Sequence, residues 1–248
     1  MSRFVRGAWR FARVLLQVLR GLALVLLRFE RLDAHQRREQ VLRWSQQLLA
    51  AAGVRLVVDG QARPGAKLFV ANHVSWLDIV AINAVAPARF VSKAEVRRWP
   101  LLNRLVDAGG TLYIERERRR DALRVVHQVA EALQAGQTVA VFPEGTTSDG
   151  HGLLPFHANL LQAAIASETP VQPIALRYSD ARHAVSPAAA YIGQINLVSS
   201  LWRVLTADDL QVRVSLLTAE GSRHLDRRAL SDRVREQIRE RLEAGDGA

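Results

Sequence analysis

The chain has 248 residues, 49% of them hydrophobic, which is enough to bury the core of one α/β domain with additional helices. It contains no cysteine, which excludes disulfides, thiolate metal sites and an acyl-enzyme intermediate on a cysteine. The formal net charge of +10, carried almost entirely by arginine, favours anionic partners such as lipid headgroups, phosphorylated substrates or nucleic acid.

The N-terminal stretch predicts an amphipathic helix, because arginines recur at steps of three or four among apolar residues. Its uninterrupted apolar runs, 14–16 and 21–27, are far shorter than the roughly 18 to 20 residues that span a bilayer. We therefore expect this helix to lie in the headgroup region, with its arginines toward anionic lipid. The alternative is a helix that packs on the protein core. The cationic stripe consists of Arg3, Arg6, Arg10, Arg13 and Arg20, with Gln17 in the same series.

A second helix is predicted from Gln36 to Ala52, where Gly53 ends it. The two helices form a hairpin over residues 1–52, which we expect at the membrane interface. The catalytic domain is expected to occupy residues 53–248.

Short apolar runs that alternate with helical patterns predict an α/β fold with a largely parallel central sheet flanked by helices. We find no internal repeat and no interdomain linker. The predicted strands are 54–58, 67–71, 89–92, 111–114, 138–142, 171–176 (interrupted by Pro173) and 211–217 (at the sheet edge); the predicted helices are 79–85, 95–106, 121–133 (capped by Asp121), 156–166 and 226–242 (covering the sheet).

One strand end carries a candidate catalytic pair. The apolar run 68–71 stops at Asn72 and His73, and the spacing of Ser75 and Asp78 is that of a capping box for the next helix. Asp78 would then lie close enough to orient the His73 imidazole as a general base. By itself such a pair is common by chance. A serine beside a histidine also suggests a nucleophile, although a capping role would engage the Ser75 hydroxyl with backbone N–H groups.

Two further strand ends carry polar groups, and ligands of open α/β sheets bind outside the carboxyl ends of parallel strands. Gly109 and Gly110 precede a strand that delivers Arg116, whose guanidinium is suited to phosphate. Residues 143–148, which follow another buried strand, offer a carboxylate, hydroxyls and backbone N–H groups to an anion or a polyol. Residues 118–120 are expected in a solvated basic loop.

Together these blocks resemble the lysophospholipid acyltransferase family, specifically its bacterial 1-acyl-sn-glycerol-3-phosphate acyltransferases. The likeness covers about residues 50–220, and the N-terminal hairpin is also similar to the membrane anchor of that family. Asn72, His73 and Asp78 match the N-H-x-x-x-x-D block, 110–116 looks like the second block, 142–146 match F-P-E-G-T, and Val171, Pro173 and Ile174 resemble the fourth block.

The resemblance implies a glycerolipid acyltransferase fold and transfer of a fatty acyl group from a thioester of acyl carrier protein or coenzyme A to the free hydroxyl of a lysophospholipid. No cofactor beyond that co-substrate and no metal are expected. His73 is expected to act as the base and Asp78 to orient it. The resemblance also implies the cytoplasmic face of the bacterial inner membrane, with a peripheral or in-plane monotopic protein on an anionic surface. The expected substrate-binding residues are Asn72, Lys93, Arg116, Glu144, Gly145, Thr146 and Thr147.

Two departures from the family pattern concern the acceptor. Thr147 and Ser148 stand where many members carry an arginine, and His157 stands where a lysine commonly follows the phenylalanine. Both remove a cation from the expected headgroup site. Lyso-ornithine lipid is therefore an alternative acceptor to lysophosphatidic acid, because the E-G-T-T-S form also looks like lyso-ornithine-lipid acyltransferases.

Two other classes of function were weighed. A metal-dependent hydrolase would use His73 and Asp78 as ligands, but the seven histidines are scattered and form no H-E-x-x-H motif. A non-enzymatic protein that binds anionic lipid or nucleic acid would exploit the charge. Aromatic residues make up only 6% and are not interleaved with the basic residues, so nucleic acid is not an expected partner.

Overall fold

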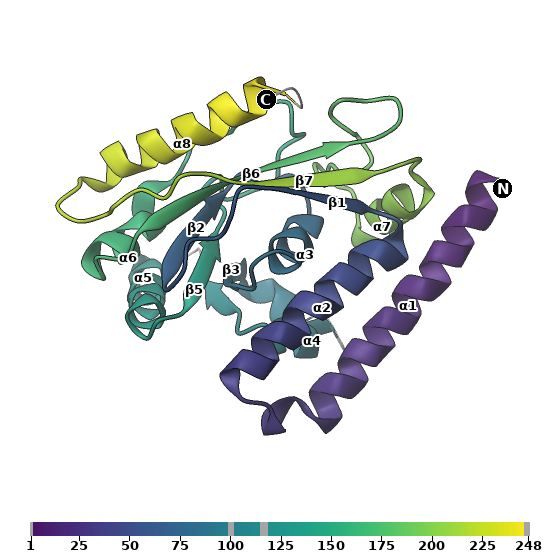
Figure 1. Ribbon diagram of the computed structural model, residues 1–248, viewed down its shortest axis with the longest axis horizontal. Helices are drawn as coiled ribbons and strands as arrows, with labels where there is room; N and C mark the ends of the chain where they lie inside the picture. Colours follow the sequence, from purple (N-terminus) through teal and green to yellow (C-terminus); the bar gives the residue numbers. More distant parts are fainter. Residues whose placement is uncertain (1, 99–101, 115–118, 246–248) are drawn as a thin grey trace.

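The computed structural model describes residues 2–98, 102–114 and 119–245, and over these residues it forms a seven-stranded sheet in the order β1-β7-β6-β2-β5-β3-β4 (Figure 1). The five strands from β6 to β4 run parallel, whereas β7 pairs antiparallel to β6 and parallel to β1. The predicted α/β fold with a largely parallel sheet is confirmed. The strands are β1 Arg55–Asp59, β2 Lys67–Ala71, β3 Arg89–Lys93, β4 Leu112–Ile114, β5 Thr138–Val141, β6 Val171–Ser179 and β7 Gln211–Leu216.

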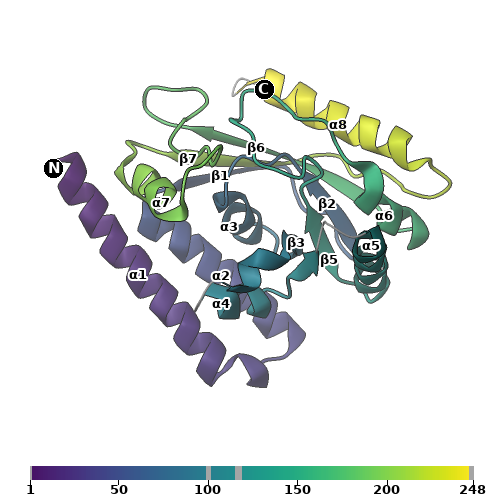
Figure 2. The same cartoon turned by 180° about the vertical axis from the view of Figure 1, so that it is seen from behind.

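Helices cover both faces of the sheet (Figures 1 and 2). One apolar core lies between the sheet and α1, α2, α3 and α7, and a second lies between the sheet and α5, α6 and α8. β2 is buried at every position, as its continuous apolar run predicts. The helices are α1 Arg3–Leu27, α2 Ala34–Ala52, α3 Leu77–Asn83, α4 Leu102–Ala108, α5 Arg119–Gln134, α6 Leu161–Ala166, α7 Leu197–Thr206 and α8 Arg227–Glu243, with 3-10 turns at Phe29–Arg31, Ala94–Arg98 and Ala158–Leu160.

Several element predictions were wrong in detail. β7 is an interior strand between β1 and β6, because β1 adds beyond it. Pro173 does not interrupt β6. Proline lacks only the backbone N–H, and the Pro173 carbonyl still accepts from the Leu217 N–H at 2.9 Å. The helix predicted from Asp121 already begins at Arg119, within the run expected to be a loop.

Helix α7 was not predicted. The Asn196 side chain caps it by accepting from the Ser199 N–H at 2.8 Å. Its apolar side packs on α1, where Gly7 permits close approach: a Cβ at Gly7 would lie 2.7 Å from Thr206 and 3.0 Å from Trp202. Helix α7 thus ties the N-terminal helix to the body of the protein.

Helices α1 and α2 form the predicted hairpin and lie side by side in both views (Figures 1 and 2). Asp33 and Gln36 form a capping box at the start of α2, and Gly53 ends it in a left-handed conformation. Gly21 allows α1 to approach Trp44, since a Cβ there would lie 2.4 Å from the indole nitrogen. The apolar core on this face of the sheet includes Val14 of α1, so the hairpin and the following domain share one core. The division of the chain between residues 52 and 53 stays a prediction.

Two arginines of the predicted stripe, Arg6 and Arg10, turn toward the protein instead of toward lipid as expected. Arg6 donates to Asp208 at 3.0 Å and to the Thr206 carbonyl at 3.2 Å. Arg10 donates to the Leu205 and Ala207 carbonyls at 3.1 and 2.9 Å. These carbonyls belong to the C-terminal end of α7, where unpaired acceptors and the helix dipole favour a cation. For Arg6 and Arg10 the prediction was wrong, because amphipathic spacing shows that a cationic stripe exists but not what each arginine contacts.

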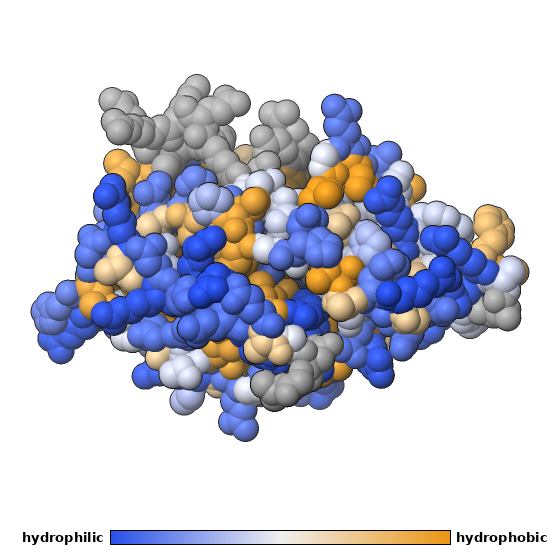
Figure 3. Space-filling view, turned by 90° about the horizontal axis from the view of Figure 1, so that it is seen from above, coloured by the Kyte–Doolittle hydropathy of each residue, from blue (hydrophilic) through white to orange (hydrophobic). Residues whose placement is uncertain are grey.

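The outward surface of α1 is therefore mainly apolar. Phe4 is 70% exposed and Leu27 is 71% exposed, and the apolar side chains between them continue the same surface. None of the described helices combines the length and apolar character needed to cross a bilayer. By contrast, the face on the α8 side of the molecule is mostly hydrophilic (Figure 3). The exposed apolar side chains of α1 are Phe4, Val5, Trp9, Phe11, Leu15, Leu16, Leu19, Leu26 and Leu27.

Candidate active site

The register of the sheet brings two of the predicted polar strand ends together. Val70 of β2 pairs with Val141 of β5 on one side and with Pro173 of β6 on the other. The segments that follow β2 and β5 therefore emerge next to each other, at the carboxyl edge where ligands bind in sheets of this kind. The His73 carbonyl accepts from the Ser148 N–H at 2.7 Å, which joins the two segments directly.

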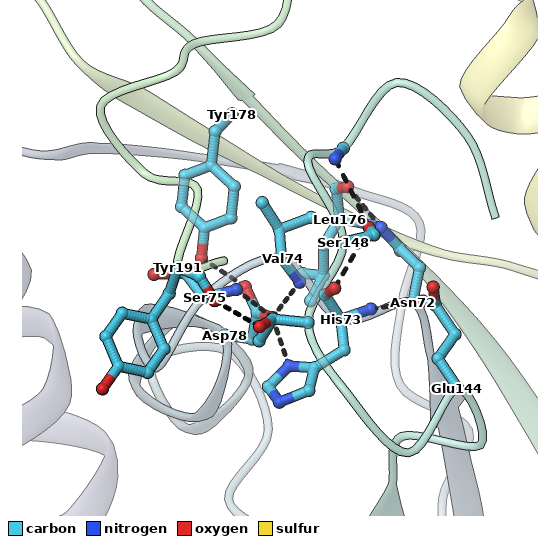
Figure 4. Close-up of polar contacts among 12 residues, drawn as sticks. Asn72, His73, Val74, Ser75, Asp78, Glu144, Ser148, Leu176, Tyr178 and Tyr191 are labelled. Atoms are coloured by element: carbon cyan, nitrogen blue, oxygen red, sulfur yellow. Dashed lines mark hydrogen bonds and ion pairs between the residues drawn. The ribbon is translucent and has the colours of Figure 1, made fainter. Parts of the chain in front are cut away.

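His73 and Asp78 form the predicted pair. The His73 Nδ1 atom lies 2.7 Å from Asp78 Oδ2, in the arrangement drawn in Figure 4. An ionised carboxylate only accepts hydrogen bonds, so this contact assigns the proton to Nδ1 and leaves the Nε2 lone pair free. The His73 ring stacks on Phe142, with centroids 4.0 Å apart, and its side chain is 20% exposed. The free nitrogen is thus held in a fixed direction by one polar and one aromatic contact.

Asp78 is completely buried and its oxygens accept from several donors. Oδ2 also accepts from the backbone N–H groups of Val74 at 2.7 Å and Ser75 at 2.9 Å, while Oδ1 accepts from the Tyr178 hydroxyl at 2.7 Å. A buried carboxylate needs such donors to offset its lost hydration. With these oxygens so engaged, Asp78 is suited to orient His73 rather than to bind a metal.

Ser75 does not cap the next helix as expected. Helix α3 begins at Leu77, with Trp76 as its N-cap and no side-chain cap. The Ser75 hydroxyl is buried without a hydrogen-bond partner among the described residues, because the Asp78 N–H that it would cap donates to the Ser75 carbonyl at 3.1 Å. The Asp78 carboxylate does accept from the Ser75 N–H, as in a capping box. Ser75 has no exposed surface, so a role as nucleophile is not supported by its position.

Asn72 fixes the end of β2 to β6. Its side-chain amide donates to the Leu176 carbonyl at 2.9 Å and accepts from the Leu176 N–H at 2.7 Å. The amide thus extends the backbone pairing by one step past the strand. Asn72 is 1% exposed, so its geometry supports a positioning role for the loop that carries His73, rather than the expected contact with substrate.

Glu144 is also buried, at 4% exposed, and holds two loops together. Its Oε1 accepts from the His73 N–H at 2.7 Å and its Oε2 from the Leu154 N–H at 3.0 Å. Burial raises the pKa of the Glu144 carboxyl, and these two backbone hydrogen bonds oppose that rise. The geometry again supports positioning of His73, and direct substrate binding by Glu144 is not supported by it.

Replacing Glu144 by glutamine tests this positioning role. One amide oxygen cannot accept from both backbone N–H groups, and the amide NH₂ would face the second one. We expect the free energy of unfolding to fall by about 1–3 kcal/mol in urea titrations. Turnover should fall as well because His73 is displaced. A Glu236→Gln variant, whose partner Arg239 is on the surface of α8, should change stability little; equal losses in both variants would contradict the role of Glu144.

The remaining predicted binding residues fall into two groups. Gly145, which has a positive φ of 71°, and Thr146 and Thr147 line a cavity beside His73. The Thr147 hydroxyl donates to the Tyr191 carbonyl, which joins the loop before α7 to this turn. Arg116 lies outside the described residues, and so does the side chain of Lys93. Their roles stay predictions.

The cavity beside His73 has a volume of about 730 Å³ and is mainly apolar. It lies between the helical hairpin, α3, α4 and the end of β3, and His73 lines it together with the 145–147 turn. No Lys or Arg is found among its lining residues that the structure describes. Such a space accommodates an extended apolar ligand whose reactive end lies at the imidazole. Lining side chains include Val14, Val18, Leu24, Trp44, Leu48, Ile79, Phe90 and Leu105.

Comparison with known proteins shows which proteins this chain resembles. A family model described as Acyltransferase matches residues 55–177. The chain is 40% identical to a 1-acyl-sn-glycerol-3-phosphate acyltransferase of Neisseria meningitidis over 208 residues, which cover 82% of this chain and 80% of that protein. The chain belongs to the acyltransferase family. It is also 40% identical to a lyso-ornithine lipid O-acyltransferase of Pseudomonas aeruginosa over 238 residues, 93% of this chain and 91% of that protein.

The fold of this acyltransferase is shared with a solved structure, the 1-acyl-sn-glycerophosphate acyltransferase PlsC of Thermotoga maritima. The TM-score is 0.75 at 19% sequence identity, and the match covers 99% of this chain and 98% of the other. The N-terminal hairpin is therefore included in the match. The predicted family is confirmed.

Three contributions to the acyltransferase site were missed from the sequence. Phe142, which stacks on His73, was noted only as part of a motif. Tyr178 lies beyond the predicted strand 171–176, and nothing in the sequence indicated its partner. The hairpin was expected at a membrane, yet Val14 and Trp44 also line the cavity. The apolar periodicity of the hairpin indicates only that one side of each helix is covered. It does not show whether those side chains line a cavity or pack in a core.

Proposed function

We propose that this acyltransferase moves a fatty acyl group from a thioester of acyl carrier protein or coenzyme A to the free hydroxyl of a lysophospholipid, 1-acyl-sn-glycerol-3-phosphate. The observation that carries this proposal is the His73 ring, fixed by Asp78 through Nδ1, at the edge of a large apolar cavity. An acyl chain is the kind of ligand that such a cavity takes. Fixing the ring places a base beside the reactive end of that chain.

The reaction proposed is a single displacement. Nε2 of His73 takes the proton of the acceptor hydroxyl, and the oxygen attacks the thioester carbonyl. The C–S bond breaks, the sulfur leaves as a thiolate and takes the proton back from the imidazolium, and an ester and a thiol are formed. Asp78 stabilises the imidazolium between these two proton transfers. Arg116 and Lys93 are proposed to hold the acceptor phosphate.

Lyso-ornithine lipid is a second candidate acceptor. It is favoured by the 145–148 turn, which carries hydroxyl groups where a cation is expected for a phosphate. The relative from Pseudomonas aeruginosa named for that acceptor also matches 93% of this chain. The two acceptors differ in their headgroups: lysophosphatidic acid carries a phosphate, and lyso-ornithine lipid carries an ornithine.

The experiment is a product analysis by mass spectrometry. Purified protein is incubated with palmitoyl-coenzyme A or palmitoyl acyl carrier protein and, separately, with lysophosphatidic acid, lyso-ornithine lipid or lysophosphatidylethanolamine. The proposal expects the mass of phosphatidic acid, formed fastest of the three products. Faster formation of ornithine lipid selects the second candidate, and no acylated product from any acceptor overturns both.

We further propose that the hairpin lies in the interface of an anionic membrane, on the cytoplasmic face, without crossing the bilayer. The exposed apolar surface of α1 supports this, because isolated exposed side chains are common but a continuous apolar helix face is not. Arg13 and Arg20 are exposed beside that face and are suited to anionic headgroups, whereas the inward-facing Arg6 and Arg10 are not. The same hairpin lines the cavity, so membrane contact would place the acyl chain close to the lipid phase.

Replacing Leu16 and Leu19 together by glutamate tests this surface. Each is about half exposed, at 48% and 51%, so folding should survive. In the proposed membrane-bound state the lipid buries both leucines, so their loss should cost about 3 kcal/mol or more of the binding free energy. We therefore expect membrane binding to fall about 100-fold. Binding is measured by flotation with vesicles of phosphatidylethanolamine and phosphatidylglycerol. Val58→Glu, at an exposed position of β1, is the matched control and should bind normally; undiminished binding of the double variant would disprove the assignment.

A further inference from the structure

Tyr178 is a buried tyrosine whose hydroxyl reaches the catalytic carboxylate. It lies on β6, is 2% exposed, and donates to Asp78 Oδ1 at 2.7 Å. Figure 4 shows the phenol and the imidazole approaching Asp78 from different directions. The family motifs do not include this position.

The two oxygens of Asp78 have different partners. Oδ2 accepts from His73 and from two backbone N–H groups of its own loop. Oδ1 accepts from Tyr178, which comes from β6, the strand that pairs with β2. The three contacts to Oδ2 restrain the rotation of the carboxylate about its bond to Cβ, which is otherwise a soft torsion, from one side only. The hydrogen bond from Tyr178 to Oδ1 adds a restraint from the other side and gives that buried oxygen its donor.

We propose that Tyr178 is a positioning residue for the acyl transfer, holding the Asp78 carboxylate in the plane that orients His73 and reducing the negative charge that His73 experiences. This inference rests on the proposed function for its effect on turnover. Its effect on the imidazole itself does not depend on the substrate. Tyr178 touches no reacting atom and acts only through Asp78.

The protonation of the phenol agrees with this role. Burial and the neighbouring Asp78 carboxylate raise the pKa of Tyr178 well above its usual value. The hydroxyl therefore stays a donor at every pH at which the protein works. The titratable groups described around Asp78 are His73 in its own loop, Tyr178 on β6 and Glu144 after β5.

The direct test compares Tyr178→Phe with Tyr113→Phe. Without the phenol, Asp78 carries more unshielded charge, so the imidazolium is more stable and His73 keeps its proton to higher pH. The acidic limb of the kcat/KM profile should move up by about half a pH unit or more. The kcat value should fall about 10- to 100-fold with an unchanged KM for the acceptor. Tyr113 donates to Asp107 at the same distance of 2.7 Å, but on β4 at the edge of the sheet, and its variant should keep the wild-type profile.

If the Tyr178→Phe protein does not fold, a second measurement on protein with its tyrosines intact tests the same inference. Replacement of the tyrosines by 3-fluorotyrosine keeps the ring and makes the phenol a stronger donor. The acidic limb should then move to lower pH, opposite to the effect of the phenylalanine variant. This shift should persist in Tyr113→Phe and in Tyr191→Phe proteins. An acidic limb that does not move on fluorination overturns the inference.

An NMR titration separates this inference from the proposed function. The His73 ring signals, assigned by their loss in His73→Ala, are followed against pH in wild type and Tyr178→Phe without any substrate. An upward shift of the midpoint supports the positioning role even if no lysolipid is acylated. Coincident titrations of the two proteins, with both folded, overturn it even if acyl transfer is confirmed.

Discussion

Replacing His73 by alanine should lower kcat by about 100- to 10,000-fold, the usual contribution of a positioned base. The side chain proposed to accept the hydroxyl proton is then missing, while the cavity proposed for the acyl chain remains. Stability should change little, because the ring is partly exposed and its neighbours Phe142 and Asp78 are held by other contacts. The measurement is the initial rate of acylated lipid at saturating donor and acceptor.

His183→Ala is the matched control for that prediction. His183 also places Nδ1 on a carboxylate, at 2.8 Å from Asp180, but in an exposed loop outside the cavity. Its loss should leave kcat unchanged. If the two variants had equal activity, His73 would have no chemical role.

The second large effect is expected for Asp78→Asn. The amide is neutral and so no longer stabilises the imidazolium or selects the Nδ1–H form, which should lower kcat by about 1,000-fold or more. The variant also loses charge-assisted hydrogen bonds in a fully buried site, so the free energy of unfolding should fall by about 1.5–3 kcal/mol. Rates must therefore be measured below the unfolding transition, which circular dichroism locates.

Asp180→Asn provides the comparison for Asp78→Asn. Asp180 accepts from His183, Ser186 and backbone N–H groups in a surface loop, so it loses a similar set of contacts away from the cavity. Its kcat should stay at the wild-type value. An Asp78→Asn enzyme that keeps normal kcat would show that His73 needs no carboxylate partner.

The features that were predicted correctly are those encoded over short stretches. The run 68–71 is continuously apolar and its successors are polar, so a buried strand that ends at His73 follows from the local pattern. The contact of His73 with Asp78 spans five positions and a single turn, so spacing alone brings the pair within reach.

The features that were missed depend on register and on long-range packing. Tyr178 meets Asp78 across 100 positions, and only the pairing of β6 with β2 brings them together. The inward direction of Arg6 depends on α7, which lies about 200 residues later in the chain. The pairing of β1 with β7 made β7 an interior strand, although its alternating pattern is typical of an edge.

In the proposed reaction, a thioester is cleaved only by a lysolipid hydroxyl that His73 activates. The most direct measurement is thiol release from palmitoyl-coenzyme A, followed with a thiol reagent, with and without lysophosphatidic acid, for wild type and His73→Ala. We expect that thiol release requires both the acceptor and His73, with one thiol formed for each new ester. Release without acceptor, or equal release by the alanine variant, would contradict it.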